Sequence, residues 1–143
     1  MPAKDTAQLE HDLTEADNVK NFLDDNAENL RKFTLAEYLR RLLAEKNLTR
    51  AQVIRDSQLK PDYAPHIFAG RKNPSRAKVL SLALAMKLSP KEADYLLYYA
   101  GHNKLYARDE WDAVIAFALL NGKTVLETDK LLTDLNLAPL IDA

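Results

Sequence analysis

Apolar residues recur at intervals of three and four positions along most of this chain, and this spacing predicts α-helices. In residues 35–46, Leu35, Tyr38, Leu39 and Leu42 share one helix face. The same pattern predicts further helices at about residues 18–30, 50–57, 61–69, 76–87, 90–100, 109–120 and 125–135. The strict alternation of apolar and polar residues that marks a half-buried strand is absent, so an all-α fold is expected.

A four-residue signature marks several of the expected helix starts. Serine or threonine is followed three residues later by glutamate or glutamine, just before an apolar run. The first side chain can accept a hydrogen bond from a free backbone N–H, and the fourth can reach back to the first residue. This signature of a capping box occurs at Thr34–Glu37, Thr49–Gln52, Ser89–Glu92 and Thr124–Glu127. Gly70, Gly101 and Gly122 each follow an expected helix, where a left-handed C-cap belongs.

Two of the predicted helical hairpins, residues 76–100 and 111–135, are related by a weak repeat at an offset of 35 residues. Leucine matches between helices arise easily by chance, so coincidence and duplication are equally good interpretations. If duplication holds, the second hairpin stacks on the first and extends its core. The segment 113–120 is apolar all round and is expected to be buried, either under the second hairpin or against another subunit. The matching residues are Val79, Ala83, Leu84, Glu92, Asp94, Leu96, Leu97 and Leu105 with Val114, Ala118, Leu119, Glu127, Asp129, Leu131, Leu132 and Leu140.

Charge is segregated along the chain, although the net charge is −1. Residues 1–30 carry two lysines against eight acids, a net of −6. Residues 40–87 carry eleven lysines and arginines against three acids, a net of +8, and residues 88–143 carry five against nine, a net of −4. A basic block between acidic segments indicates an anionic partner, although charges on solvated helix faces also cluster by chance.

The residues that carry most enzyme chemistry are missing or scattered. The chain has no cysteine, which excludes disulfides, thiolate zinc sites and cysteine nucleophiles. His11, His66 and His102 have no partner at metal-ligand spacing, and no glycine-rich loop can hold a phosphate. We therefore expect no enzymatic activity, no metal and no cofactor.

The length and hydropathy of the chain limit where it works. A chain of 143 residues is one domain, or one small domain with extensions. No apolar run approaches the roughly 20 residues that cross a bilayer, and the first residues lack the apolar stretch of a signal peptide. A cytoplasmic protein with no membrane contact is expected.

Residues 48–75 carry the pattern of a helix-turn-helix: two short helices around a tight turn, then a glycine and a basic loop. Its marks are Leu48-Thr49, Ile54, Tyr63, Ile67 and the run from Gly70 to Ser75. In this order and spacing, residues 34–100 resemble the DNA-binding domain of Cro and phage-repressor proteins, also called the xenobiotic response element family. The resemblance implies a lambda-repressor-like domain of about five helices.

This domain is expected to have an extension on each side. Residues 1–33 are predicted to be an acidic N-terminal arm with one helix, residues 34–100 the helix-turn-helix domain, and residues 101–143 a C-terminal helical hairpin. The arm is interpreted as a poorly ordered segment with a docked helix, or as a segment that mimics the charge of DNA and covers the basic block. The hairpin is expected to pack on the domain or on a second subunit.

The resemblance also implies which residues touch DNA. The first residue of the second helix, Arg50, would contact a phosphate, as would the loop that follows the third helix. Base contacts would fall on Pro61, Asp62 and His66, with Lys60 at the margin. The full expected set of DNA-binding residues is Arg50, Lys60, Asp62, His66, Arg71, Lys72, Asn73, Arg76 and Lys78.

Two prolines in the expected recognition helix depart from this family. Pro61 has no N–H with which to read a base, and Pro65 inside a helix that began at Pro61 would cost roughly 3 kcal/mol. A cheaper arrangement makes Asp62 the N-cap and places Pro65 in the first turn of a short helix, about residues 63–69. Such a helix suits phosphate and shape contacts better than base readout.

Two functions therefore remain open. The first is a DNA-binding transcription regulator that dimerises through its C-terminal hairpin and binds double-stranded DNA. The second is a protein-interaction module, antitoxin-like or an adaptor subunit, that kept the fold but reads DNA weakly or not at all. Its protein partner would bind the acidic N-terminal arm or the C-terminal hairpin.

Overall fold

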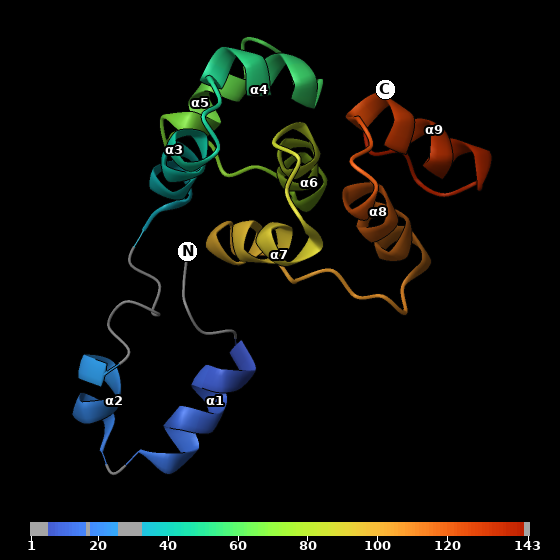
Figure 1. The fold of residues 1–143 in the computed structure, drawn as a ribbon. Helices are drawn as coiled ribbons and strands as arrows, with labels where there is room; N and C mark the ends of the chain where they lie inside the picture. Colours follow the sequence, from blue (N-terminus) through green and yellow to red (C-terminus); the bar gives the residue numbers. More distant parts are fainter. Residues whose placement is uncertain (1–5, 17, 26–32, 142–143) are drawn as a thin grey trace. The chain divides into compact units, whose positions relative to one another are not determined.

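The computed structural model describes residues 6–16, 18–25 and 33–141. These residues form nine helices and no strand, which confirms the all-α fold class (Figure 1). The chain divides into two compact units, Met1–Lys32 and Phe33–Ala143, called here the N-terminal and C-terminal units.

Within its described residues, the N-terminal unit contains two helices, α1 (Thr6–Glu15) and α2 (Val19–Asp25), which pack on each other. The prediction of one helix in this region is wrong, because α1 was missed. Helix α1 buries no residue and has no wide apolar stripe, so the pattern of apolar positions did not indicate a helix there. The predicted helix at 18–30 is observed as α2, and its last five positions lie outside the described residues.

The C-terminal unit contains seven helices within its described residues, and their bounds lie within three residues of the predicted ones. They are α3 (Leu35–Glu45), α4 (Arg50–Ser57), α5 (Ala64–Phe68), α6 (Arg76–Ala85), α7 (Pro90–Tyr99), α8 (Glu110–Leu120) and α9 (Val125–Asp134).

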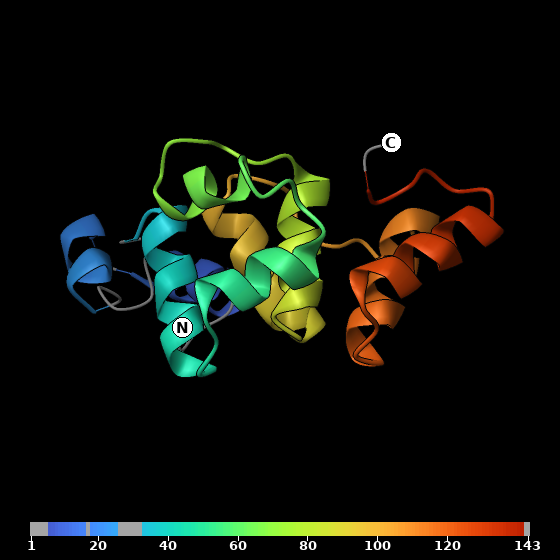
Figure 2. The ribbon, with the colours of Figure 1, turned by 90° about the horizontal axis from the view of Figure 1, so that it is seen from above.

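Helix α6 forms the centre of this unit. It packs against α4, α7, α8 and α9, and Figures 1 and 2 show it between α4 and the α8–α9 pair. Six consecutive residues, Val79–Leu84, are buried, as expected for a helix surrounded on all sides. Helix α3 packs on both α5 and α7, which joins the helix-turn-helix to the same core.

The α6–α7 and α8–α9 pairs, called here the first and second hairpins, repeat the same local hydrogen bonds 35 residues apart. Both second helices begin with a complete capping box, Ser89 with Glu92 and Thr124 with Glu127. Asp94 Oδ1 accepts from the Leu105 N–H at 2.8 Å, and Asp129 Oδ1 accepts from the Leu140 N–H at 2.7 Å. Shared bonds between distant segments favour duplication over coincidence.

The apolar segment 113–120 is only partly buried in the C-terminal unit. Ile115, Ala118 and Leu119 face the core, as predicted, whereas Phe117 is 51% exposed and Leu120 is 72% exposed. Of the two alternatives, burial of the whole segment under the second hairpin is therefore not observed. The other alternative, burial against another subunit, stays a prediction.

Candidate nucleic-acid interface

The turn between α4 and α5 is fixed by side chains that bond to the backbone. The Thr49 side chain accepts from the Gln52 N–H at 3.1 Å, which starts α4 and leaves Arg50 exposed in its first turn. Ser57 Oγ donates to the Ile54 carbonyl at 2.7 Å and accepts from the Leu59 N–H at 3.2 Å. Gln58 adopts a left-handed conformation with φ 62°, a region that glycine enters without strain.

The start of α5 differs from the sequence prediction. The N–H groups of Tyr63 and Ala64 both donate to the Lys60 carbonyl, at 3.0 and 2.9 Å, so the chain already forms a helical turn before α5. Tyr63 is the N-cap, with helical backbone and no capping side chain. The prediction that Asp62 caps this helix is therefore wrong: the coiled turn satisfies the free N–H groups, and Asp62 stays exposed. Pro65 lies in the first turn, as predicted.

His66 and Arg71 contact each other at the end of α5. Arg71 Nη1 lies 3.3 Å from His66 Nδ1. Because a guanidinium only donates, Nδ1 is the acceptor in this contact, and the ring hydrogen is on Nε2. The Arg71 N–H donates to the His66 carbonyl at 2.8 Å, and Gly70 supplies the left-handed residue with φ 80° that this helix end needs. His66 is thereby set to donate from Nε2.

The loop from Arg71 to Asn73 is exposed and anchored at both ends. On one side, Arg40 Nη1 donates to the Phe68 carbonyl at 3.0 Å, which ties α3 to the end of α5. On the other side, His102 Nε2 lies 2.9 Å from the carbonyl of buried Pro74 and donates to it. A loop held in this way presents its cations at low entropic cost.

Arg76 holds the second hairpin onto the helix-turn-helix. It forms two bonds to the Asp112 carboxylate, at 2.7 and 2.8 Å, and donates to the carbonyls of Asn103 and Lys104, both at 3.0 Å. Burial tends to raise the pKa of Asp112, but the bonds from Arg76 and from the Tyr106 N–H hold it below its usual value. Most donors of Arg76 are thus used inside the fold.

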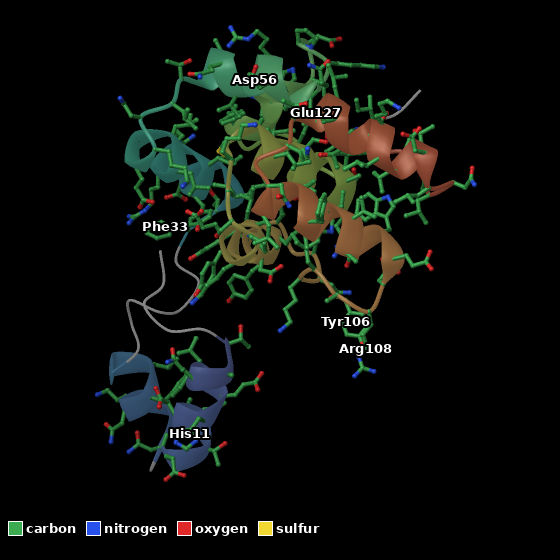
Figure 3. The ribbon with its side chains drawn as sticks, turned by 45° about the vertical axis from the view of Figure 1, so that its right-hand side comes forward. His11, Phe33, Asp56, Tyr106, Arg108 and Glu127 are labelled. Atoms are coloured by element: carbon green, nitrogen blue, oxygen red, sulfur yellow. The ribbon has the colours of Figure 1, made fainter. Side chains whose placement is uncertain are left out.

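The linker between α7 and α8 lies on the outside of this contact. Tyr106 and Arg108 project outward from it (Figure 3), and both side chains are exposed. The Tyr106 N–H nevertheless bonds inward to Asp112 Oδ2 at 2.9 Å. The linker backbone therefore helps to fix the Arg76–Asp112 contact, called here the clamp, while the side chains of Tyr106 and Arg108 remain in solvent.

Residues 34–96 match the sequence profile of a family described as "Helix-turn-helix domain". The match extends from the cap of α3 into α7. This part of the chain is a helix-turn-helix domain. The result confirms the resemblance to Cro and repressor proteins at the level of the domain. Comparisons with curated proteins and with solved structures gave no match. Helix-turn-helix domains are typically non-enzymatic DNA-binding modules.

The structure places three of the predicted contact residues of this domain in half-buried positions with a partner, and leaves the others exposed. Lys78 is half-buried, with Nζ 4.4 Å from the centre of the Tyr63 ring, and Arg76 is held by Asp112 as described. His66 is half-buried and contacts Arg71. The remaining predicted residues are exposed: Arg50, Lys60, Asp62, Arg71, Lys72 and Asn73.

The sequence pattern did not identify several residues that shape this surface. Arg40, His102 and Asp112 position the loop and the clamp from 28 to 36 residues away. Separations of this size leave no periodic signal, and a carboxylate at a helix start is well explained by the helix dipole alone. Within the described residues, no three His, Asp or Glu side chains form a metal-ligating group, and no helix is long and apolar enough to span a membrane.

Proposed function

We propose that this protein is a transcription regulator that holds double-stranded DNA chiefly through phosphate and shape contacts. The observation that carries the proposal is the exposed loop Arg71–Asn73, anchored at both ends, in a stretch with no acid between Asp62 and Glu92. Cations on a preorganised loop beside a recognition helix suit the regular spacing of DNA phosphates.

In this proposal, three exposed cations position the domain. Arg50 at the start of α4 and the pair Arg71 and Lys72 after α5 contact the phosphate backbone. The amide of Asn73 adds a neutral contact. Arg76 is left out of this set, because it already binds Asp112 and two carbonyls, and its role is to hold the second hairpin in place.

Base readout is limited in this proposal by the short recognition helix. Helix α5 has five residues, and exposed Pro61 before it can donate no hydrogen bond. His66 Nε2–H is suited to an acceptor such as the N7 or O6 of guanine, and Asp62 to the amino group of cytosine. Two such contacts give modest sequence preference, so much of the specificity would come from DNA shape.

The same proposal includes a homodimer formed through the second hairpin. Phe117, Leu120 and Leu126 are 51%, 72% and 58% exposed, an apolar set that a twofold partner would bury. A dimer would place two helix-turn-helix domains on half-sites roughly 34 Å apart. Phe117→Ser is expected to shift sedimentation from dimer toward monomer, whereas an unchanged profile would remove this surface from the interface.

A pair of charge-reversal variants tests the proposal. Arg71→Glu with Lys72→Glu should weaken binding to DNA from upstream of the protein's own gene by at least about a hundredfold. Lys91→Glu with Lys104→Glu makes the same change of charge at two exposed lysines outside the proposed contact set and should have a much smaller effect. Equal effects of the two double variants would show that DNA binding depends only on the net charge of the protein. That result would contradict the assignment of Arg71 and Lys72 as phosphate contacts.

A second candidate function rests on the prolines at the recognition helix. Pro61 and Pro65 shorten the surface that could read bases, which favours a protein-interaction module, antitoxin-like or an adaptor subunit. Its partner would bind the acidic N-terminal arm or the second hairpin. Co-purification of a stoichiometric partner that survives high salt would favour this function, whereas partner-free protein that binds DNA would count against it.

A further inference from the structure

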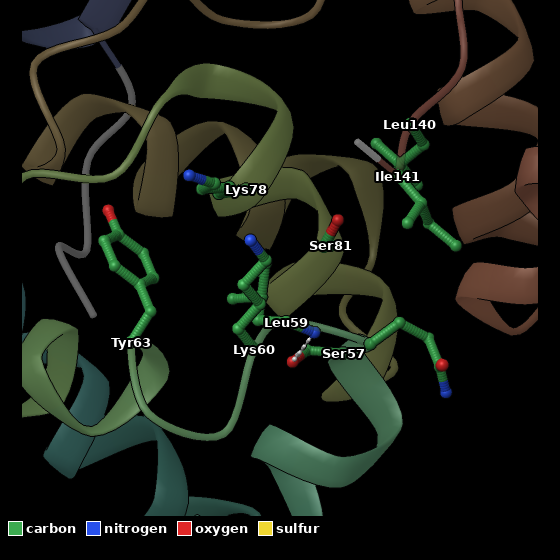
Figure 4. Close-up of a pocket in the computed structure, with 9 residues that line it drawn as sticks. Ser57, Leu59, Lys60, Tyr63, Lys78, Ser81, Leu140 and Ile141 are labelled. Carbon is green, nitrogen blue, oxygen red and sulfur yellow. Dashed lines mark hydrogen bonds between the residues drawn. The ribbon is translucent and has the colours of Figure 1, made fainter. Parts of the chain in front are cut away.

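A pocket of about 210 Å³ lies beside the turn that leads into α5. Three segments that are far apart in the sequence form its walls: the turn of residues 57–60 with Tyr63, helix α6, and residues 140–141 near the C-terminus (Figure 4). All of them belong to the C-terminal unit. The helix-turn-helix and the second hairpin therefore both contribute to one cavity.

One side of this pocket is cationic. Lys60 and Lys78 both line it, and neither forms an ion pair within residues 33–141. Lys78 Nζ lies 4.4 Å from the centre of the Tyr63 ring, so the aromatic face holds this ammonium group at the pocket. Figure 4 shows both lysine side chains on the side of the pocket where Tyr63 lies. Two ammonium groups, with no carboxylate among the described residues that line the pocket, favour an anionic ligand.

The opposite side is apolar and firmly held. Leu140 and Ile141 lie across the pocket from Tyr63 in Figure 4. Both of their N–H groups donate to Asp129 Oδ1, at 2.7 and 3.1 Å. The Trp111 side chain adds a bond to the Ala138 carbonyl at 2.9 Å. The apolar wall is thus built by the fold rather than by a loose terminus.

We propose that this pocket binds a small amphipathic anion, a carboxylate or phosphate group joined to a short aliphatic chain or ring. The anionic group lies between Lys60 and Lys78, and the apolar part lies against Leu140 and Ile141. The volume sets the size: it is below the roughly 300–1,000 Å³ of pockets for drug-sized ligands. A bare phosphate would leave the apolar wall uncovered, and an uncharged chain would leave the lysines unpaired.

Occupancy of the pocket should change DNA binding, a consequence that rests on the proposed function. The ligand would neutralise Lys60 and Lys78, two residues of the expected DNA-contact set, next to the turn that precedes α5. It would also join the C-terminal segment to the helix-turn-helix. The binding itself does not depend on DNA and is tested without it.

The test is a titration of the full chain with sodium hexanoate and with hexyl phosphate, followed by amide NMR at constant ionic strength. Shift changes should concentrate in residues 57–63, 78–81 and 140–141. Uncharged 1-hexanol should bind about tenfold or more weakly, the loss expected for a missing charged hydrogen bond. Scattered shifts, or equal binding of hexanol, would overturn the proposal. Inorganic phosphate that binds as tightly as hexyl phosphate would also overturn it, in favour of a site for backbone phosphate.

Three variants locate the ligand in the pocket. Lys78→Met keeps the aliphatic stem and should weaken hexanoate binding about tenfold, and Ile141→Ser should weaken it severalfold by removing apolar contact. Lys91→Met removes an exposed lysine on α7, outside the pocket, and should leave binding unchanged. Hexanoate binding that survives both pocket variants would overturn the assignment, whatever the protein does with DNA.

Discussion

The first and second hairpins of the C-terminal unit have the same local construction but different surroundings. Both carry the capping box, the left-handed helix ends and the aspartate that accepts from a backbone N–H eleven residues later. The first hairpin is covered by α3 and α4 on one side and by the second hairpin on another. At equivalent positions, Leu82 is fully buried and Phe117 is half exposed.

This contrast separates two influences on one repeated pattern. Local hydrogen bonds set the shape of each hairpin, and neighbouring elements decide which apolar residues are buried. The second hairpin keeps apolar residues, such as Phe117 and Leu120, on a face that no described residue of the C-terminal unit covers. This exposed face is the basis on which a second subunit is proposed to bind there.

The largest expected difference lies at the equivalent pair Leu82 and Phe117. Leu82→Ala leaves a cavity in the centre of α6 and should lower the free energy of unfolding by roughly 3–4 kcal/mol. Phe117→Ala should cost the monomer less than about 1 kcal/mol, because the side chain is already half in solvent. Urea unfolding at low protein concentration measures both. Equal losses would show that the hairpins are equally buried and contradict the comparison.

The clamp between Arg76 and Asp112 should show the next largest effect. Its acidic half belongs to the second hairpin alone, because the position equivalent to Asp112 in the first hairpin is Ala77. Asp112→Asn should cost roughly 2–3 kcal/mol, since Arg76 loses its charged partner in a partly buried site. Asp134→Asn breaks the exposed pair with Lys130 and should cost about 0.5 kcal/mol or less. A similarly small loss of stability for Asp112→Asn would show that the clamp does not stabilise the fold.

The same clamp predicts a dependence on pH. The pKa of Asp112 is lowered in the folded protein, so its contribution to stability is complete above the titration range of an unfolded aspartate, near pH 4. That contribution is lost as the pH falls through the lowered pKa. Wild-type protein should therefore lose more unfolding free energy on acidification than Asp112→Asn. Parallel losses in the two proteins would contradict the bonds that lower this pKa.

The repeated aspartates should behave alike. Asp94→Ala and Asp129→Ala each leave backbone N–H groups without an acceptor and should cost about 1–2 kcal/mol. Asp94→Asn and Asp129→Asn keep an acceptor oxygen and serve as matched controls with smaller losses. Thermal unfolding of the four variants measures the effect. A loss at only one of the two alanine variants would speak against a shared construction.

The capping boxes should give the smallest effects. Ser89→Ala and Thr124→Ala each remove the side chain that accepts from the third residue of the helix, at 3.1 Å in both hairpins. A loss of about 1 kcal/mol is expected at each position. Ser89→Thr and Thr124→Ser keep the acceptor and should be nearly neutral. If the alanine variants are as stable as these controls, the caps contribute nothing beyond helix propensity.

Much of this fold could be predicted from the sequence because its signals are local. Caps, left-handed glycines and apolar periodicity located seven of the nine described helices with their starts and ends, and placed α2 more loosely. Helix α1 was missed because it buries no residue and so carries no periodic signal. The cap of α5 was misassigned, because the turn at Lys60 satisfies the N–H groups that a capping aspartate would have bonded.

The candidate site was less predictable, because its geometry depends on contacts between distant residues. No residue near Arg76 in the sequence indicates that Asp112 will bind it. Likewise, no residue near Pro74 indicates that His102 will bond to its carbonyl. The same holds for the pocket, where Lys78 and Ile141 meet only after the second hairpin has folded back. Sequence patterns report which residues are basic and exposed, whereas tertiary packing decides which of them remain free.

The most direct test of DNA binding is an anisotropy titration with labelled duplex from upstream of the protein's own gene and with a scrambled duplex, each at two salt concentrations. We expect binding to both, a modest preference for the upstream duplex, and a logarithmic salt slope of roughly −3 per domain for Arg50, Arg71 and Lys72. The absence of binding to either duplex at low salt would contradict the account and make the protein-interaction module the better reading of this fold.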